Sequence, residues 1–442
     1  MKRILIDLTD LELWAGQHGG TQRVVYGIAK NFYLQRDELG YEVCFVAFSA
    51  RDKLFYETDF APIYERVEAL KQAASQPASS GGVSLKTRLK YRLRPYVPES
   101  VRRNPKARKL AVTSARYGVR VLKAARAKQQ QYRTHHVEGK RLQLIRFQPT
   151  DTVLMLGKPW DNPDIQRRLT EQRGRHGFRL VQLVYDMIIP LNPQLHHPSL
   201  FKPYTQHMFE AISASDLLLP ISKSTERDVK TFCKRLALPV PPMKVIRLGD
   251  EVIDTAIEGL AKPDPRIAGE FIACVGTIEI RKNHMLLYYA YKRAAELGIE
   301  LPQLVIVGSR GWLSGDFQYL AEHDPHLKGK IIILDNINDA ALGWVYGNCL
   351  FTVYPSMYEG WGLPVAESLA RHKLCIASDA SSIPEIAGDL IDYFSPYDPA
   401  DCLQVLQRYL DKPTLEKKEL QIAATYVPHS WQDTYRQVLM AL

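Results

Sequence analysis

Short apolar stretches recur along this 442-residue chain, and helix-length segments separate most of them. Stretches of four to eight apolar residues are typical of strands that are buried on both faces of a parallel sheet. The alternation of strand and helix predicts an α/β fold in which helices cover the sheets. The first series comprises residues 2–8, 41–48, 152–157, 179–186, 216–222 and 244–249, and the second comprises residues 271–276, 303–309, 330–336, 350–356 and 373–378.

The two series predict two domains, because a chain of this length is long for one hydrophobic core. The Pro-rich segment 262–266 lies between the series and is the expected linker. We predict a Rossmann-like, doubly wound domain over residues 1–262, a second over 263–425, and a helix over 426–442 that packs back on the first domain. Such sheets bind ligands at the carboxyl ends of their strands, so the two domains would face each other across a cleft.

A strongly basic segment, residues 65–145, interrupts the first series and is interpreted as an insertion in the first domain. Residues 65–143 contain 20 Lys and Arg against 4 Asp and Glu, a local charge of +16, whereas the whole chain has a formal net charge of +10. The rest of the chain is therefore mildly acidic, at −6. Within the segment, residues 75–82 have the composition of a linker, and residues 111–131 are a possible basic helix.

Three interpretations of this basic segment are open. Attraction to an anionic membrane surface is the first, because each Lys or Arg near such a surface contributes about 1 kcal/mol of binding. Nucleic-acid binding is the second, since tyrosines are interleaved with the basic residues, but it explains nothing about residues 271–397. A solvated, disordered insertion is the third.

Several classes of protein are disfavoured by what the sequence lacks. The six cysteines form no C-x-x-C pair and have no metal-ligand spacing, so we expect reduced core residues, no metal site and a cytoplasmic chain. No apolar run reaches the length of a membrane-spanning helix. There is no D-x-D triplet, no G-x-G-x-x-G after the first strand and no G-x-x-x-x-G-K-[ST]. A transferase that holds a metal through D-x-D, a dehydrogenase and an ATPase are therefore unfavoured, and no cofactor is expected.

The sharpest local pattern is YEGWGLPVAE, residues 358–367, which directly follows an apolar stretch. Gly360 and Gly362 permit a tight loop that approaches a ligand closely. Pro364 suits the first turn of a helix. The pattern therefore predicts a strand, a glycine loop and a helix N-terminus, which attracts anions such as a diphosphate.

Two carboxylates bracket this loop, and each has a structural alternative. Glu359 would lie on the loop and Glu367 in the second turn of the helix. A carboxylate there can accept hydrogen bonds from the vicinal hydroxyls of a ribose. Alternatively, Glu359 only interacts with the helix dipole and Glu367 is a solvated helix residue.

Two adjacent cations follow the strand at 271–276. Arg281 and Lys282 come after Gly276 and adjoin a predicted helix N-terminus. A sugar nucleotide leaves as a diphosphate, whose developing charge requires fixed cations or a metal. The planar fork of Arg281 and the point charge of Lys282 together suit two phosphates, although a solvated surface pair is the structural alternative.

On these motifs the second half resembles the donor-binding domain of the family-4 retaining glycosyltransferases, which have the GT-B architecture. The resemblance lies in GTIEIRKNH (276–284), VIVGSRGW (305–312), YPSMYEGWGLPVAESLA (354–370) and SDASSIPEIAGD (378–389), in the family's order. More narrowly, the chain resembles bacterial mannosyltransferases that build surface polysaccharides such as O-antigen.

The resemblance implies a role for each matching residue. Glu367 would bind the ribose, Arg281 and Lys282 the diphosphate, and Glu359 the transferred sugar. The other donor-binding positions would be Gly276, Ile337, Gly360, Gly362 and Leu363. For Ile337, which follows the stretch 330–336, a core role is equally open.

The match in the first half is weaker. The segment GQHGGTQR (16–23) occupies the position of the family's glycine-rich loop, so Gly19 and Gly20 would approach the donor, unless the segment is a plain turn. The segment LVYDMIIP (183–190) resembles a motif with His-Asp at its centre, but Tyr185 replaces the histidine. Asp186 would orient the acceptor or help to remove its proton, or it only caps the next turn.

The expected function is transfer of a hexose from a nucleoside-diphosphate sugar to a hydroxyl of a growing or lipid-linked bacterial glycan. The resemblance implies retention of anomeric configuration and GDP-mannose as the first choice of donor. Rhamnose or another deoxyhexose is the nearest alternative. The enzyme is expected to be metal-independent, cytoplasmic and peripheral on the inner face of the membrane. A nucleic-acid-binding protein and a non-catalytic, sugar-binding scaffold are the rivals.

Overall fold

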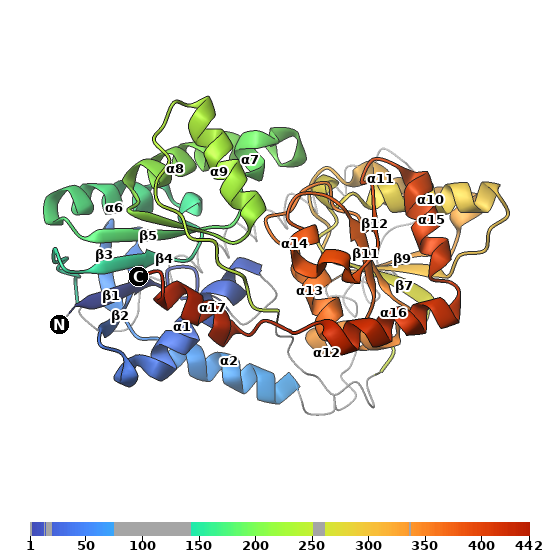
Figure 1. Ribbon diagram of the computed structural model, residues 1–442, viewed down its shortest axis with the longest axis horizontal. Coiled ribbons are helices and arrows are strands. Elements are labelled where there is room, and N and C mark those ends of the chain that lie inside the picture. The colour runs from blue at the N-terminus through green and yellow to red at the C-terminus, as the bar shows by residue number, and fades with distance from the viewer. Residues whose placement is uncertain (1, 13, 15–19, 75–142, 251–260, 336) are drawn as a thin grey trace, which may run out of the picture. The chain divides into compact units, whose positions relative to one another are not determined.

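The computed structural model describes all residues except 1, 13, 15–19, 75–142, 251–260 and 336. Two six-stranded sheets with flanking helices account for most of the described chain (Figure 1). The α/β class and the two strand series predicted from the sequence are therefore confirmed. Gly19, the linker-like stretch 75–82 and the possible basic helix 111–131 lie outside the described residues.

The first sheet has the order β3-β2-β1-β4-β5-β6. Its strands are β1 (Arg3–Asp7), β2 (Glu42–Ser49), β3 (Leu54–Thr58), β4 (Thr152–Met155), β5 (Arg179–Val184) and β6 (Leu217–Pro220). All neighbours pair in parallel except β2 and β3, which form an antiparallel pair. The chain adds strands on one side of β1 and then on the other, so the topological switch point lies between β1 and β4.

The helices of this half are α1 (Gly20–Gln35), α2 (Ala61–Ala74), α6 (Pro163–His176), α7 (Ile188–Leu191), α8 (Phe201–Ala214) and α9 (Lys223–Arg235). Local sequence explains where they begin. The side chains of Asn162 and Ser222 accept hydrogen bonds from the first turns of α6 and α9, which makes both residues N-caps. In α1, Val24, Val25, Ile28 and Phe32 form a buried stripe at helical spacing.

The second sheet has the order β12-β11-β10-β7-β8-β9, and every pair of neighbours is parallel. Its strands are β7 (Phe271–Val275), β8 (Gln303–Val307), β9 (Ile331–Leu334), β10 (Thr352–Tyr354), β11 (Cys375–Ser378) and β12 (Tyr393–Phe394). The helices are α10 (His284–Glu296), α11 (Gly315–His323), α12 (Asp339–Asn348), α13 (Leu363–Ala370), α14 (Pro384–Ala387), α15 (Pro399–Arg408), α16 (Lys412–Thr425) and α17 (Trp431–Leu439).

Three features differ from the sequence prediction. Residues 244–249 form no strand; the backbone of Lys244 and Ile246 donates only to Leu218 and Pro220 at the edge of β6. Just before them, the carbonyl of Pro242 accepts a hydrogen bond from the backbone N–H of Leu218, and Met243 forms an isolated bridge with Leu218. The short strands β3 and β12 were not predicted, because their sequences carry too few apolar residues to stand out.

The basic segment also begins later than the prediction placed it. Residues 65–74 belong to α2, and Val67 is buried in the core of the first half. At the other end, Leu144 bridges Tyr56 of β3, and the backbone N–H of Ile145 donates to Phe55. The described first half therefore includes residues 65–74 and 144–145 of the segment that was predicted as an insertion.

The last helix, α17, packs on α1. The ring of Tyr435 lies edge-on to that of Phe32, with the ring centroids 4.7 Å apart. Ser430 and Asp433 form a capping box that fixes where α17 begins. Among the described residues, no helix combines the length and the apolar character that crossing a membrane requires.

Candidate active site

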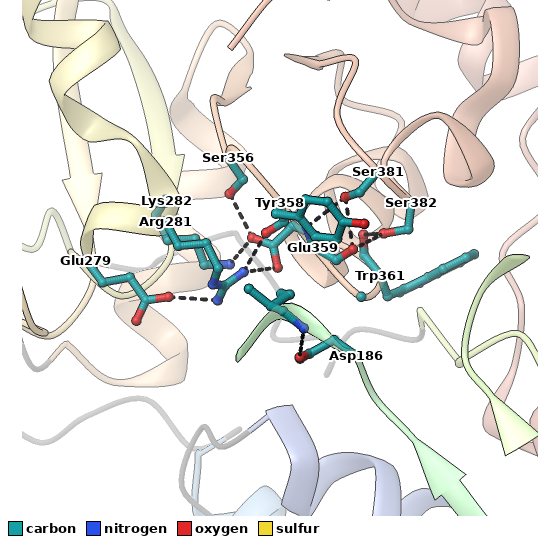
Figure 2. Close-up of polar contacts among 12 residues, drawn as sticks. Asp186, Glu279, Arg281, Lys282, Ser356, Tyr358, Glu359, Trp361, Ser381 and Ser382 are labelled. Atoms are coloured by element: carbon teal, nitrogen blue, oxygen red, sulfur yellow. Dashed lines mark hydrogen bonds and ion pairs between the residues drawn. The ribbon is translucent and has the colours of Figure 1, made fainter. Parts of the chain in front are cut away.

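The predicted cations and the loop carboxylate come together at the carboxyl ends of two neighbouring strands. Arg281 and Lys282 lie in a 3-10 turn, Ile280–Lys282, after β7. Glu359 lies on the loop between β10 and α13. Because β7 and β10 are adjacent and parallel, both connections emerge at the same edge of the sheet. Figure 2 shows the side chains of Arg281, Lys282 and Glu359 close to one another.

Glu359 is the centre of this cluster and is only 7% exposed. One carboxylate oxygen lies 2.5 Å from Nη1 of Arg281, and the other lies 2.7 Å from Nζ of Lys282. The hydroxyls of Tyr354 and Ser356 donate to the second oxygen, at 2.9 and 2.7 Å. Glu359 therefore does more than interact with a helix dipole, because its carboxylate accepts charge-assisted hydrogen bonds from two cations.

The charges of the cluster determine its protonation state. Burial alone would raise the pKa of Glu359, but Arg281 and Lys282 outweigh it and hold that pKa at about 2. Burial lowers the pKa of Lys282, and the adjacent Arg281 lowers it further, against the attraction of Glu359. The carboxylate is therefore ionised across the physiological range, while Lys282 loses its proton more easily than a solvated lysine.

Arg281 is shared among three partners. Its Nη2 donates to Glu279 at 2.7 Å, and its Nη1 donates to the carbonyl of Tyr358 at 2.9 Å. Its Nε is buried and has no hydrogen-bond partner among the described residues. A buried guanidinium N–H without an acceptor favours an added anion, and a phosphate oxygen would fit this requirement.

Serines hold the loop that carries Glu359. The hydroxyls of Ser381 and Ser382 both donate to the backbone carbonyl of Glu359 at 2.9 Å, and Ser382 also donates to that of Trp361 at 2.8 Å (Figure 2). The backbone N–H of Glu359 in turn donates to Ser381 at 2.8 Å. The loop conformation is thus fixed by the segment that follows β11.

Glu367 belongs to a second cluster, in the second turn of α13. It is 5% exposed and accepts hydrogen bonds from Nη1 of Arg23 at 2.7 Å and from the hydroxyl of Tyr346 at 3.1 Å. The alternative of a solvated helix residue is therefore wrong. Arg23, on α1, is a polar partner that sequence reasoning did not single out, although it ends the glycine-rich segment 16–23.

The glycines of the loop have identifiable roles. Gly362 has a φ of +139°, which side chains rarely allow, and it immediately precedes α13 and its Pro364. At Gly360, an added Cβ would lie 2.0 Å from the carbonyl oxygen of Tyr185. Gly360 therefore permits the backbone at the end of β5 to approach the donor loop.

Asp186 follows Tyr185, and its carboxylate accepts a hydrogen bond from the backbone N–H of Ile188 at 3.0 Å. This contact is the cap of the following turn, which was one of the two roles predicted for Asp186. Burial raises the pKa of Asp186, while Arg281 and Lys282 lower it and Glu359 raises it. The carboxylate thus interacts electrostatically with the charged groups of the cluster. The role of Asp186 in orienting the acceptor or removing its proton stays a prediction.

The other residues predicted to bind the donor lie on several different elements. Gly276 has a φ of +152° and lies beside Lys282. Leu363 opens α13 and lies 3.8 Å from the Cβ position of Gly20, the first residue of α1. Ile337 packs partly buried against the core cluster of β7, β8 and β9, which supports its core role.

Five residues that the sequence analysis did not predict also contact the charged cluster or its loop. Glu279, Tyr354 and Ser356 surround the charged cluster, and Ser381 and Ser382 brace its loop. All of them lie within or beside the quoted motifs, so motif position was the available signal. Within the described residues, no group of three His, Cys, Asp or Glu side chains is arranged to hold a metal ion.

Comparisons with known proteins agree with this arrangement. Residues 261–425 match the family model described as "Glycosyl transferases group 1". The serotype-specific mannosyltransferase WbdA of Escherichia coli is 25% identical over 260 residues, which cover 56% of this chain and 32% of that protein. The O-antigen chain mannosyltransferase B of Escherichia coli is 26% identical over 267 residues, which cover 60% of this chain and 70% of that protein. The chain thus spans about a third of the length of the first relative.

Solved structures show the same fold. HepE from Anabaena, crystallised with UDP-glucose, superimposes with a TM-score of 0.57 and 13% identity over the whole of both chains. A glycosyltransferase from Rickettsia africae gives a TM-score of 0.55 and 14% identity, covering 100% of this chain and 97% of that one. At such identities the likeness concerns the fold alone, and it confirms the predicted GT-B class. Residues 261–425 therefore form a glycosyltransferase group 1 domain, the second of two Rossmann-like halves in a GT-B-type chain.

Proposed function

We propose that the chain transfers a hexose from a nucleoside-diphosphate sugar to a hydroxyl of a bacterial surface glycan. The observation that carries this proposal is the buried cluster of Arg281, Lys282 and Glu359 at the strand ends of a glycosyltransferase group 1 domain. Mannose from GDP-mannose is the first choice of donor, since the Escherichia coli relatives are named as mannosyltransferases. A rhamnosyl or other deoxyhexosyl donor is the alternative.

The cluster supports stabilisation of a leaving diphosphate. As the bond between the anomeric carbon and the diphosphate breaks, negative charge grows on the phosphate oxygens, and Arg281 and Lys282 lie ready to neutralise it. The unpartnered Nε–H of Arg281 supplies one donor at once. Glu359 holds both cations in place and is available to a hydroxyl of the transferred sugar.

The acceptor hydroxyl forms the new bond to the anomeric carbon on the face that the diphosphate leaves, so configuration is retained. Its proton passes to the departing phosphate oxygen. Retention rests on the family resemblance and not on the geometry of the cluster. Asp186 would orient the acceptor from the end of β5, since its carboxylate senses the charges of Arg281 and Lys282.

Glu367 would receive the ribose hydroxyls of the nucleotide. Its carboxylate is already held by Arg23 and Tyr346, which fix its orientation on α13. Two hydroxyls of a ribose would compete with, or add to, these two contacts. No part of this site requires a metal, and independence from metal remains part of the proposal.

The basic segment would place the enzyme at its acceptor. A charge of +16 within residues 65–143 suits attraction to the anionic inner face of a bacterial membrane, where a lipid-linked glycan is presented. A peripheral, cytoplasmic location follows from this proposal.

Thermal unfolding in the presence of GDP-, UDP-, dTDP- and ADP-linked sugars tests the donor site. We expect one nucleotide to raise the melting temperature, because a ligand at a hundred times its Kd stabilises the folded state by about 2.7 kcal/mol. The Glu367→Ala variant should lose this shift. Glu322→Ala, which removes an exposed carboxylate on α11, should keep it.

Hexose transfer with the nucleotide so identified tests the diphosphate site. Arg281→Ala and Lys282→Ala should each lower kcat by about 10²–10³, the cost of losing a donor to a developing anion. Arg310→Ala, which removes an exposed arginine that follows β8, is the matched control. Near-normal turnover in the Arg281/Lys282 double variant would contradict the proposed site.

A further inference from the structure

A cavity of about 440 Å³ is lined in part by residues 278–280 and 283, which flank Arg281 and Lys282. Its size falls within the range of small-molecule sites, roughly 300–1,000 Å³. The lining comes from the segment after β7, from α10 and α11, and from the loops before α11, α13 and α15; it includes His284, Tyr289, Leu313, Phe317, Met357 and Tyr397. None of these six side chains has a role in the proposed transfer step.

His284 is the first reason to regard this cavity as a binding site. It is 2% exposed, and neither of its ring nitrogens has a hydrogen-bond partner among the described residues. Its ring packs on Phe317, with the centroids 5.5 Å apart. Burial lowers the pKa of His284 to about 3, so the ring is neutral and offers one N–H donor and one acceptor nitrogen. Buried polar groups in proteins nearly always have a hydrogen-bond partner, so the imidazole of His284 is suited to bind a ligand that supplies one.

The rim of the cavity is the second reason. Leu313 is 55% exposed and has a φ of +53°, an uncommon conformation for a residue with a bulky side chain. Tyr289 and Tyr397 are 49% and 75% exposed. Strained backbone and exposed aromatic rings gather at ligand sites more than on ordinary surface.

The lining defines the chemistry of the ligand. Most of it is apolar or aromatic, which suits a molecule with an apolar face. The paired donor and acceptor of His284 require groups that both donate and accept hydrogen bonds. A hydrocarbon chain would leave His284 unpaired, whereas a sugar ring offers C–H faces to tyrosine rings and hydroxyls to the imidazole.

The cavity is close to the transfer site. Met357, in its lining, donates its backbone N–H to the carbonyl of Arg281 at 2.8 Å. Glu279 also lines the cavity and forms the ion pair with Arg281 at 2.7 Å. Asn283, with a φ of +57°, joins the cavity to the loops by donating to the carbonyls of Pro355 and Pro396. A ligand here would thus lie one layer of residues away from the catalytic cations.

We propose that this cavity is a second glycan-binding site, which holds a sugar unit of the acceptor polymer through His284, Tyr289 and Tyr397 while another unit is at the transfer site. The proposal rests on the proposed function, because it assumes that the acceptor is a glycan. Its consequence is a preference for acceptors of several sugar units over acceptors of one.

Binding of oligosaccharides in the absence of a sugar nucleotide tests the cavity separately from catalysis. The probes are linear tetrasaccharides of mannose and of rhamnose, titrated calorimetrically into the full chain carrying Glu367→Ala, which disables the proposed nucleotide site. We expect one tetrasaccharide to bind, and Tyr397→Ala or His284→Phe to weaken it about tenfold, the effect of losing a contact of about 1.4 kcal/mol. Tyr319→Ala, which removes an exposed tyrosine of α11 outside the cavity, should bind as before.

Turnover gives the second measurement. In Tyr397→Ala, we expect KM for the tetrasaccharide to rise about tenfold toward that of a methyl monosaccharide, with kcat unchanged. If neither tetrasaccharide binds, or if both variants bind it as tightly as the unsubstituted chain, the glycan site is refuted. Hexose transfer that persists in that case would leave the proposed function standing, whereas binding without any transfer would refute the function and keep the site.

Discussion

Carboxylates in this protein differ in protonation because their surroundings differ. Glu359 is buried between two cations, and its pKa is held at about 2. Asp7, at the end of β1, is buried to 3% exposure and accepts its hydrogen bonds from Thr9. Burial, the largest effect, and the nearby Asp10 raise the pKa of Asp7 against the hydrogen bonds from Thr9, and the net pKa is about 7. The same functional group is thus ionised in one half and only about half ionised at neutral pH in the other.

Asp7 should make stability depend on pH. Its pKa is higher in the folded than in the unfolded state, so the stability that it contributes is fully present below about pH 4 and is lost as pH rises through about 7. Over that window, the free energy of unfolding should fall by up to about 4 kcal/mol, since each pKa unit corresponds to about 1.4 kcal/mol. Urea unfolding of Asp7→Asn from pH 4 to 8 should show a flatter profile. Asp37→Asn, at an exposed position, should retain the original slope.

At the scale of elements, the site depends on how closely strand ends pack. After β7 and β8, the chain continues through Gly276 and Gly308, and the N–H of Gly276 donates to the carbonyl of Val307 at 2.9 Å. An added Cβ at Gly308 would lie 1.9 Å from the carbonyl oxygen of Gly276. The backbone that leads to Arg281 is therefore held in position by a glycine on the neighbouring strand.

Gly308→Ala should therefore disturb both stability and the site. The alanine must push the backbone of Gly276 away, and overpacking of this kind costs about 1–3 kcal/mol. We expect a lower melting temperature and weaker binding of the nucleotide sugar. Gly315→Ala is the control, because an added Cβ at the start of α11 meets nothing within 4 Å. Equal melting temperatures of the two variants would contradict the close-packing account.

At the scale of the whole molecule, charge and catalysis occupy different parts of the chain. Residues 77–143 contain 18 Lys and Arg against 2 Asp and Glu, whereas the rest of the chain is mildly acidic. Arg281, Lys282, Glu359 and Glu367, which carry the proposed donor site, lie outside that segment. Membrane attraction and sugar transfer should consequently be separable by substitution.

Replacing Arg102, Arg103, Lys106, Arg108 and Lys109 by glutamine should release the chain from anionic vesicles. At about 1 kcal/mol for each of the five basic residues, the affinity for phosphatidylglycerol vesicles should fall by roughly 3.5 orders of magnitude in a sedimentation assay. Raised salt should have the same effect on the unsubstituted chain. The control replaces five exposed basic residues elsewhere, Lys230, Lys234, Arg235, Lys328 and Lys417. Salt-sensitive binding to oligonucleotides in place of vesicles would favour the nucleic-acid alternative.

Most of the fold could be predicted from the periodicity of apolar residues and the order of the motifs. Nearly all of the apolar stretches became strands, because a strand buried on both faces must be apolar throughout. The prediction failed where pairing depends on a neighbour, as in the antiparallel strand β3 and the extended segment 244–249 beside β6. It also placed residues 65–74 in the insertion, although α2 buries Val67 in the core.

For the site, the sequence by itself determined which charged residues follow which strands, because motifs and glycines are local. Adjacent parallel strands then necessarily bring Arg281, Lys282 and Glu359 to one edge. Only the tertiary structure decided their partners. The ion pair of Glu367 with Arg23 joins residues 344 positions apart, and no local pattern encodes such a contact. Burial, which shifts the pKa of Glu359 and leaves His284 unpaired, likewise arises only when distant segments pack together.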